Sequence, residues 1–253
     1  MKILLSPAKK IDTKKTLNTA NSTSPLFLKE AEQLMKKLKN LSSKKIGEMM
    51  HLSVDLSNLN HKRYQEWENI VTKNESSAYC ASVFDGEVYR GLAAENFSEE
   101  ELEIAQDKIR ILSGLYGILK PMDIIYPYRL EMGTKWQITP KTKNLYQFWG
   151  KKIAENINAE NSDGIIINLA SNEYFKAVDK KTLEGRIITP SFKEFKNGEY
   201  KTIMVYAKKA RGMMARYIVK NNIINPEEIK LFNVDGYQFD VNQSSENEWL
   251  FTR

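Results

Sequence analysis

The sequence of 253 residues contains one cysteine, Cys80, and two histidines, His51 and His61. A single thiol excludes an internal disulfide. These three side chains are also fewer than the four ligands of a structural zinc site, and neither histidine lies in the context of a catalytic triad. The shortage of such residues argues against a zinc protein and against a histidine-dependent hydrolase, and we expect no metal.

Long apolar runs are missing as well. The first one, Ile3-Leu4-Leu5, is too short for the apolar region of a signal peptide, and no later run approaches the length of a membrane span. Gly86 and Gly91 belong neither to a phosphate-binding loop with its lysine nor to a dinucleotide fingerprint, so we expect no cofactor. We expect a cytoplasmic protein with no membrane partner, and we favour a monomer.

The chain does have enough apolar sequence for a core, and a modest excess of positive charge. Hydrophobic residues make up 42% of it, and Lys plus Arg exceed Asp plus Glu by 38 to 32. One core suffices at this length, so we predict a single domain over residues 1–253. The net charge of +6 fits either a solvated lysine-rich surface or a nucleic-acid partner, and only clustered charges would favour the second.

Hydrophobic periodicity predicts helices and strands that do not alternate regularly. Asn197-Gly198 between two β-rich runs, residues 186–195 and 200–207, predicts a hairpin, and Ser98 with Glu101 predicts a helix that begins with a capping box. The other predicted elements are strands over residues 3–5, 78–83, 165–169, 232–240 and 249–252, helices over 24–41, 44–50, 60–68, 145–157 and 208–221, and a turn-rich segment over 53–60. This order indicates an α/β protein with a mixed sheet flanked by helices.

Cations recur on one side of the helix predicted over residues 208–221. At about 100° per residue, Lys209, Arg216 and Lys220 fall in one narrow stripe. Gly212 lies beside this stripe and leaves room for a backbone or a ligand to come close. A phosphate backbone suits such a stripe, because it attracts cations without base-specific geometry. The pattern is equally typical of an amphipathic surface helix, and both interpretations stay open.

Polar side chains follow three of the apolar stretches. Ser6 comes after the first strand, Ser113 lies in the glycine-punctuated stretch over residues 111–119, and Ser171 follows the strand over 165–169. Ligand sites of open α/β sheets gather beyond the carboxyl ends of the strands, so we expect these turns to converge. Arg129 and Glu131 allow two interpretations. They form a buried ion pair, or the arginine faces a phosphate or carboxylate.

Five segments carry a resemblance to a known family. They are Leu5-Ser6-Pro7-Ala8-Lys9, Leu112-Ser113-Gly114-Leu115-Tyr116-Gly117, Pro127-Tyr128-Arg129-Leu130-Glu131-Met132-Gly133, Asn168-Leu169-Ala170-Ser171 with Glu173-Tyr174-Phe175, and Tyr206-Ala207-Lys208-Lys209-Ala210-Arg211-Gly212. In this order they resemble the YaaA family, the peroxide stress response proteins, and Tyr146-Gln147-Phe148-Trp149-Gly150 fits the same family.

The resemblance implies a compact domain with a positively charged cleft, a helix-hairpin-helix-like element, DNA binding, and protection from peroxide by limiting free iron. We place the helix-hairpin-helix-like element at residues 41–64, where Gly47 stands alone in place of a Gly-x-Gly turn. No iron site is evident in the sequence, so we expect any effect on iron-dependent damage to be indirect.

We therefore predict a DNA-binding protein of the oxidative stress response that contacts phosphates in its basic cleft and selects DNA structure rather than sequence. The residues expected to contact DNA are Lys9, Arg129, Lys208, Lys209, Arg211 and Arg216. The alternative is an enzyme that acts on a nucleotide or nucleobase in the same cleft, with Glu131, Glu173 and Ser6 as catalytic candidates.

Overall fold

The computed structural model describes residues 1–69, 74 and 76–253. Its centre is an eight-stranded mixed sheet in the order β11-β12-β9-β8-β1-β5-β6, with β10 paired to β9. The strands are β1 Lys2–Leu5, β5 Ile109–Ser113, β6 Gly117–Leu119, β8 Ile165–Asn168, β9 Arg186–Lys196, β10 Glu199–Lys201, β11 Gln238–Phe239 and β12 Glu248–Thr252. The predicted α/β fold with a mixed sheet in one compact domain is confirmed.

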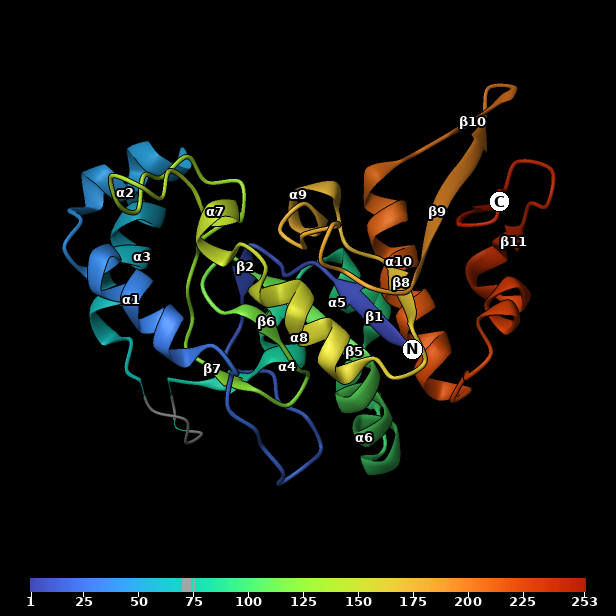
Figure 1. Ribbon diagram of the computed structural model, residues 1–253, viewed down its shortest axis with the longest axis horizontal. Helices are drawn as coiled ribbons and strands as arrows, with labels where there is room; N and C mark the ends of the chain where they lie inside the picture. Colours follow the sequence, from blue (N-terminus) through green and yellow to red (C-terminus); the bar gives the residue numbers. More distant parts are fainter. Residues whose placement is uncertain (70–73, 75) are drawn as a thin grey trace.

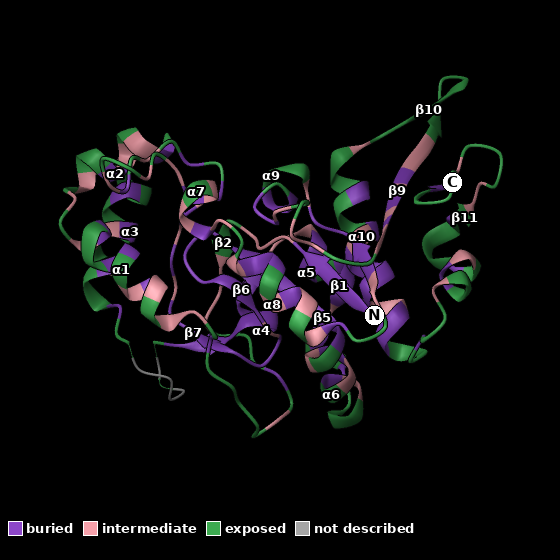
Figure 2. Ribbon diagram, in the orientation of Figure 1, coloured by how far each residue is buried: buried purple, intermediate pink, exposed green. Residues whose placement is uncertain are grey.

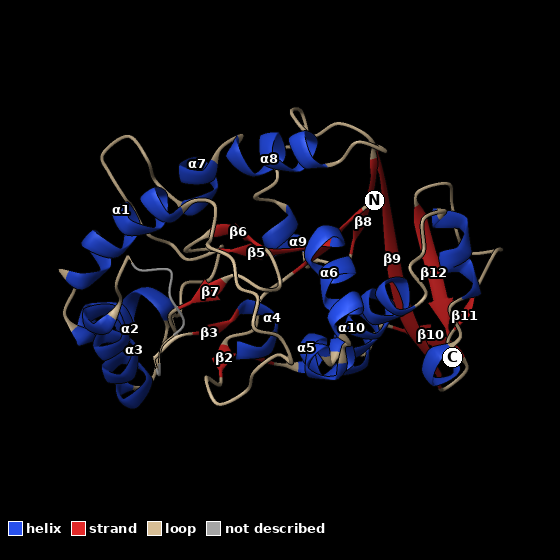
Figure 3. Cartoon of the chain, turned by 90° about the horizontal axis from the view of Figure 1, so that it is seen from below, coloured by secondary structure: helices blue, strands red, loops and turns tan. Residues whose placement is uncertain are grey.

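Helices cover both faces of this sheet, with α7 and α8 on one side and α5, α6 and α10 on the other (Figure 3). The α-helices are α1 Leu28–Lys39, α2 Ser43–Met50, α3 Val54–Glu66, α4 Cys80–Val83, α5 Glu87–Leu92, α6 Glu99–Lys108, α7 Leu145–Trp149, α8 Lys152–Glu160, α9 Asn172–Phe175 and α10 Met204–Lys220. Short 3₁₀ helices span Ala94–Asn96, Pro226–Leu231 and Val234–Gly236. Two small antiparallel pairs complete the fold, β2 Lys10–Ile11 with β4 Phe84–Asp85, and β3 Ala78–Tyr79 with β7 Ile124–Ile125.

Strand β1 lies in the middle of the core, which runs along the sheet (Figure 2). It pairs in parallel with β5 and with β8, so that Ile3 lies between Ile109 and Ile167. Strands buried on both faces are near-continuous apolar runs, which explains why Ile3-Leu4-Leu5 and residues 165–167 could be identified from the sequence. All three strands run the same way, so their carboxyl ends lie at one edge of the sheet.

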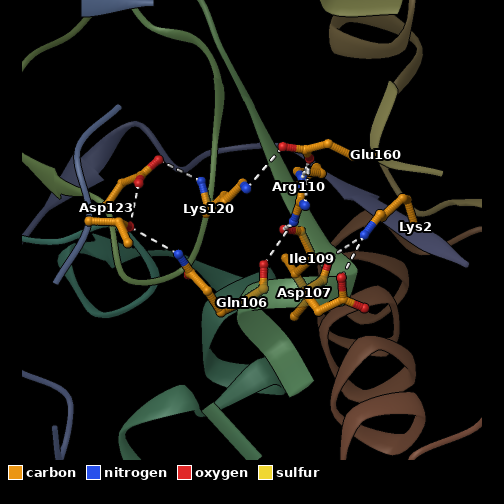
Figure 4. A network of polar contacts seen from close by, with 9 residues as sticks. Lys2, Gln106, Asp107, Ile109, Arg110, Lys120, Asp123 and Glu160 are labelled. Atoms are coloured by element: carbon orange, nitrogen blue, oxygen red, sulfur yellow. Dashed lines mark hydrogen bonds and ion pairs between the residues drawn. The ribbon is translucent and has the colours of Figure 1, made fainter. Parts of the chain in front are cut away.

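The opposite edge is closed by ion pairs, several of which Figure 4 shows. The buried Lys2 donates to both the carbonyl and the carboxylate of Asp107, each at 2.8 Å. Arg110, whose side chain is 3% exposed, meets Glu160 at 2.6 Å, and Lys120 reaches the same carboxylate at 2.9 Å. The charges at this edge therefore already have partners within the fold.

Two local predictions are confirmed. Ser98 and Glu101 form the reciprocal capping box of α6. At the Asn197-Gly198 turn both residues have positive φ, 54° and 81°, which is the geometry of a two-residue hairpin between twisted strands.

Other predictions are wrong in their boundaries. Cys80 begins the short helix α4 and does not lie in a strand, although it is fully buried, and burial raises the pKa of its thiol well above the usual value. The first helix begins at Leu28 and not after Ser24, because Thr23 is held extended by backbone hydrogen bonds to Met122 and Ile124.

The segment over residues 53–60 belongs to α3. Ser53 acts as its N-cap and accepts a hydrogen bond from the Leu56 amide, so a serine taken for a turn residue starts a helix. Likewise α10 begins at Met204, within the stretch that was predicted to continue the hairpin strand.

Helices α5 and α10 pack backbone to backbone through two glycines. A Cβ on Gly212 would lie 1.8 Å from the Val88 carbonyl oxygen, and one on Gly91 would lie 2.1 Å from that of Lys209. The space beside Gly212 that the sequence predicted is therefore occupied by the backbone of α5.

We expect Gly212→Ala to lower the free energy of unfolding by about 2 kcal/mol, because overpacking of about 3 kcal/mol outweighs a helix-propensity gain of about 1 kcal/mol. Urea unfolding measures the change. Lys208→Ala, an exposed change on the same helix, is the control and should leave the midpoint unchanged. An unchanged midpoint for Gly212→Ala would contradict this account of the helix contact.

Candidate functional site

The turns that follow β1, β5 and β8 do converge. The Ser6 hydroxyl donates to Ser171 Oγ at 3.2 Å and accepts the Ser171 amide at 2.9 Å. Ser113 Oγ, which is fully buried, lies 2.7 Å from the Tyr128 hydroxyl. The first link joins the ends of the neighbouring strands β1 and β8, and the second joins the end of β5 to the loop that carries Tyr128.

A small pocket opens beside these turns. Its lining consists of Pro7, Ala8, Lys9, Tyr128, Arg129, Leu130, Glu131 and Tyr174. The guanidinium of Arg129 meets Glu131 Oε1 at 3.0 Å, and Lys9 Nζ lies 3.4 Å from the same oxygen. The Arg129 and Glu131 side chains are 16% and 15% exposed. The ion pair, one of the two interpretations of these residues, is therefore present, and both residues line the pocket.

Glu173 holds the neighbouring turn in place. Its carboxylate accepts the Gly133 amide at 2.9 Å, and its backbone carbonyl accepts the Tyr146 hydroxyl at 3.1 Å. Burial, with the charges of Glu173 and Glu131 adding to it, raises the pKa of the Tyr174 hydroxyl far above its usual value. Tyr174 is therefore a neutral hydrogen-bond donor at the pocket wall.

Two further tyrosines position this site and were missed in the sequence. Tyr64, fully buried on α3, donates its hydroxyl to the Arg129 carbonyl, and Tyr89 donates to the Ser6 carbonyl at 3.1 Å. Apolar patterning marks both as core residues and contains no sign of the polar end that each one uses. Only the packing of α3 and α5 against the strand ends reveals these contacts.

Two of the three cations in the stripe along α10, Arg216 and Lys220, are bound to other parts of the fold. Arg216 donates to the carbonyls of Leu92 and Ala93 at 3.0 and 2.8 Å, where α5 ends, and its guanidinium lies 5.2 Å from the Phe97 ring centroid. Lys220 pairs with Glu101 at 2.8 Å. Arg216 and Lys220 are therefore both engaged within the fold, and contact of Arg216 with DNA stays a prediction.

Lys209 is held only weakly, because its ammonium lies 3.9 Å from the Asp235 carboxylate and both side chains are well exposed. It keeps a charge that faces solvent.

Lys208 and Arg211, in the first half of α10, differ from their neighbours. Across residues 1–69, 74 and 76–253, neither side chain has an ion pair or hydrogen bond. Lys208 is exposed, whereas Arg211 is half-buried, and burial is the cause that lowers the pKa of its guanidinium. Arg211 is thus a partly desolvated charge with no carboxylate to compensate it.

The segment over residues 41–64, where a helix-hairpin-helix-like element is predicted, lies apart from α10 (Figures 1 and 3). Residues 41–64 contain α2 and α3, joined at His51, which has a left-handed backbone. Gly47 allows the two helices to approach, since a Cβ there would lie 2.5 Å from Ser57 Oγ. Figures 1 and 3 both show this helix pair at one end of the molecule, away from α10. Its contact with DNA stays a prediction.

Among the residues placed in the structure, no cluster of three His, Cys, Asp or Glu side chains could hold a metal ion. Within the same part of the chain, no helix has both the length and the apolar character needed to cross a membrane.

The fold and this edge define a class of protein: a mixed α/β domain with polar and cationic side chains gathered where its parallel strands end. The chain belongs to the family described as "Peroxide stress protein YaaA", whose model matches residues 1–243. It is 48% identical to a UPF0246 protein of Dechloromonas aromatica over all of this chain and 99% of that one. It is also 47% identical to UPF0246 proteins of Tolumonas auensis and Flavobacterium johnsoniae, again over all of this chain and over 98% and 100% of theirs.

We expect Arg216→Ala to destabilise the protein by about 1.5 kcal/mol, because it removes charged hydrogen bonds to the last carbonyls of α5. Thermal and urea unfolding measure the loss. Lys209→Ala is the matched control, and it should change the free energy of unfolding by only about 0.5 kcal/mol or less. Equal stability of the two variants would show that the Arg216 contacts contribute nothing to folding.

Proposed function

We propose that this chain binds DNA in the peroxide stress response, through phosphate contacts centred on the first half of α10 and the neighbouring strand ends. The observation that carries the proposal is Arg211. A half-buried guanidinium without a counter-charge is costly in the free protein, and a phosphate would supply the missing charge in bidentate geometry.

We rank the other residues proposed to contact phosphate by how far their charges are unpaired and exposed to solvent. Lys208 is exposed and unpaired among the residues described, and it precedes Arg211 by about one helical turn. Lys9, 68% exposed, and Lys209 keep most of their charge facing solvent. Arg129 shares its charge with Glu131, and Arg216 is occupied by carbonyls, so we place both behind the first four.

This arrangement favours phosphate contacts over base reading. Lys208, Lys209 and Arg211 follow one helix and Lys9 lies outside it, and contacts to phosphate position a protein without reporting sequence. We therefore propose a monomeric protein that binds DNA with little sequence preference. Its effect on iron-dependent damage would be indirect, through the DNA that it occupies.

An enzyme acting on a nucleotide or nucleobase is the second candidate, because Glu131, Tyr174 and Lys9 line one pocket. The volume of this pocket is about 10 Å³, which is room for about one water molecule and not for a base. Glu173 is engaged with the Gly133 amide. Geometry thus supports the binding function better.

We expect affinity for duplex DNA to fall steeply with salt and to vary little with sequence. Arg211→Met should weaken binding about tenfold and lower the salt slope by about 1, because one phosphate contact is lost. The melting temperature of this variant should equal or exceed that of the parent, because the substitution removes an uncompensated charge from a partly buried position. Fluorescence anisotropy across a salt series, with a parallel melting curve, measures both quantities.

Lys220→Ala is the control for charge, because it removes one cation from the far end of the same helix. It should leave the affinity within about twofold. An affinity that is flat in salt, or an Arg211→Met variant that binds as well as the parent, would remove the phosphate-contact model.

We further expect Glu173→Gln to keep DNA affinity equal or slightly tighter, because it deletes a negative charge while its amide oxygen can still accept the Gly133 amide. Glu131→Gln should lower stability by about 3 kcal/mol, since it leaves Arg129 without its carboxylate. Assays of affinity, melting and turnover of a nucleotide panel test this. The enzyme would be the better account if the parent turns over a nucleotide and either variant abolishes that turnover while its DNA affinity and melting temperature stay unchanged.

A further inference from the structure

A second cavity is lined by helix α3, which Figures 1 and 3 show at the end of the molecule away from α10. Four lining residues share one face of this helix at the spacing i, i+3, i+4 and i+7, and they are Leu59, Lys62, Arg63 and Glu66. The other lining residues that the structure describes come from β2 and the turn after it, from Ser76, and from the segment after β7. Segments that are far apart in the sequence therefore form this cavity together.

Hydrogen bonds next to the cavity hold its walls in place. The Tyr64 hydroxyl on α3 donates to the Arg129 carbonyl, two residues after Pro127 of the lining. Asp12, which lies between two lining residues, donates its amide to the Val83 carbonyl at 2.8 Å. The fold itself thus fixes the shape of the cavity, as is usual for sites that bind small molecules.

Arg63 brings an uncompensated charge to this cavity. The residue is half-buried, and across residues 1–69, 74 and 76–253 its side chain has no ion pair and no hydrogen bond. Burial lowers the pKa of its guanidinium. Arg63 lies in the last turn of α3, where the end of the helix supplies only a partial negative charge. An anion in the cavity would supply the partner that this guanidinium lacks.

The charges of the lining residues that the structure describes sum to one positive charge. Lys62 and Glu66 pair with each other at 3.6 Å, and their side chains are both well exposed, so their charges cancel. Arg63 is the cation that remains in this set. A single negative charge balances it, and a carboxylate accepts two parallel hydrogen bonds from a guanidinium. A carboxylate therefore fits better than a phosphate monoester with its two charges.

The size and the apolar part of the lining define the rest of the ligand. The volume of the cavity is about 280 Å³, near the lower end of the range of roughly 300–1,000 Å³ for small-molecule sites. Ile11, Leu59 and Pro127 are partly or well exposed apolar residues of the lining. A phosphate of DNA would leave these apolar side chains without a partner, whereas the apolar body of a small organic acid would cover them.

We propose that this cavity binds a small organic carboxylate with an apolar or aromatic body, and that the Arg63 guanidinium holds its carboxylate. The body of the ligand covers the apolar lining, and the hydroxyls of Thr13 and Ser76 are available to polar substituents on it. This site lies away from the proposed phosphate contacts on α10, and it does not depend on the proposed function.

The test uses 2-naphthoate, an aromatic carboxylate, and its uncharged amide, 2-naphthamide. A titration followed by ligand-observed NMR should show that the parent binds naphthoate with a Kd of about 1 mM or below. The amide should bind about tenfold more weakly, because it has no charge for Arg63. Arg63→Met keeps the aliphatic stem and removes the charge, so it should lower the affinity for naphthoate about tenfold. Its melting temperature should equal or exceed that of the parent.

The matched control is Lys62→Met combined with Glu66→Gln. This variant removes two charges from the same face of α3 and leaves the net charge around the cavity unchanged, so it should bind naphthoate within about twofold of the parent. Leu59→Trp narrows the cavity without changing Arg63. It should weaken binding of both naphthoate and the amide, which separates the effect of shape from that of charge.

Two results would overturn the carboxylate site directly. One is a parent that binds naphthoate no better than the amide, and the other is an Arg63→Met variant that binds naphthoate as the parent does. A competition with duplex DNA supplies a third. If the duplex displaces naphthoate and Arg63→Met weakens duplex binding about tenfold, Arg63 is a phosphate contact and the proposal is wrong.

Discussion

Parallel pairing of β1 with β5 on one side and β8 on the other is the constraint on which the site depends. Side chains of β1 are buried along its whole length, so neither its register nor its direction can change without exposing the core. Since the strands share a direction, Ser6, Ser113 and Ser171 are brought to one edge although they are far apart in sequence. The hydrogen bonds between Ser6 and Ser171 then join two of these turns.

The amino and carboxyl ends of the parallel strands differ in whether the cations near them are paired. At the amino edge the cations are matched: Lys2 has Asp107, and Arg110 and Lys120 share Glu160 (Figure 4). Beyond the carboxyl edge, Arg211 has no partner among the residues that the structure describes. A net charge is a poor guide to such a difference, because exposed pairs contribute little and what matters is which cations stay uncompensated.

Helix α10 shows how one element divides its cations between folding and function. Gly212 allows close contact with α5, and that contact brings Arg216 to the carbonyls at the end of α5. Earlier on the same helix, Lys208 and Arg211 stay available. Helical periodicity grouped Lys209 with Arg216 because it reports angular position alone, and angular position does not reveal what a neighbouring helix presents.

The sequence by itself determined the features that depend on neighbouring residues and on apolar pattern. The α/β class, the buried strands at residues 3–5 and 165–167, the capping box at Ser98 and the Asn197-Gly198 hairpin all follow from local preference or from apolar runs long enough to be recognised. The convergence of the strand ends also followed, because parallel strands share an edge. Only the tertiary structure decided the start of α1 at Leu28, the helix at Cys80, and the division of the cations into paired and free. Each of these depends on contacts between segments distant in the chain, such as Thr23 with Ile124 or Arg216 with Leu92, and no local pattern records such contacts.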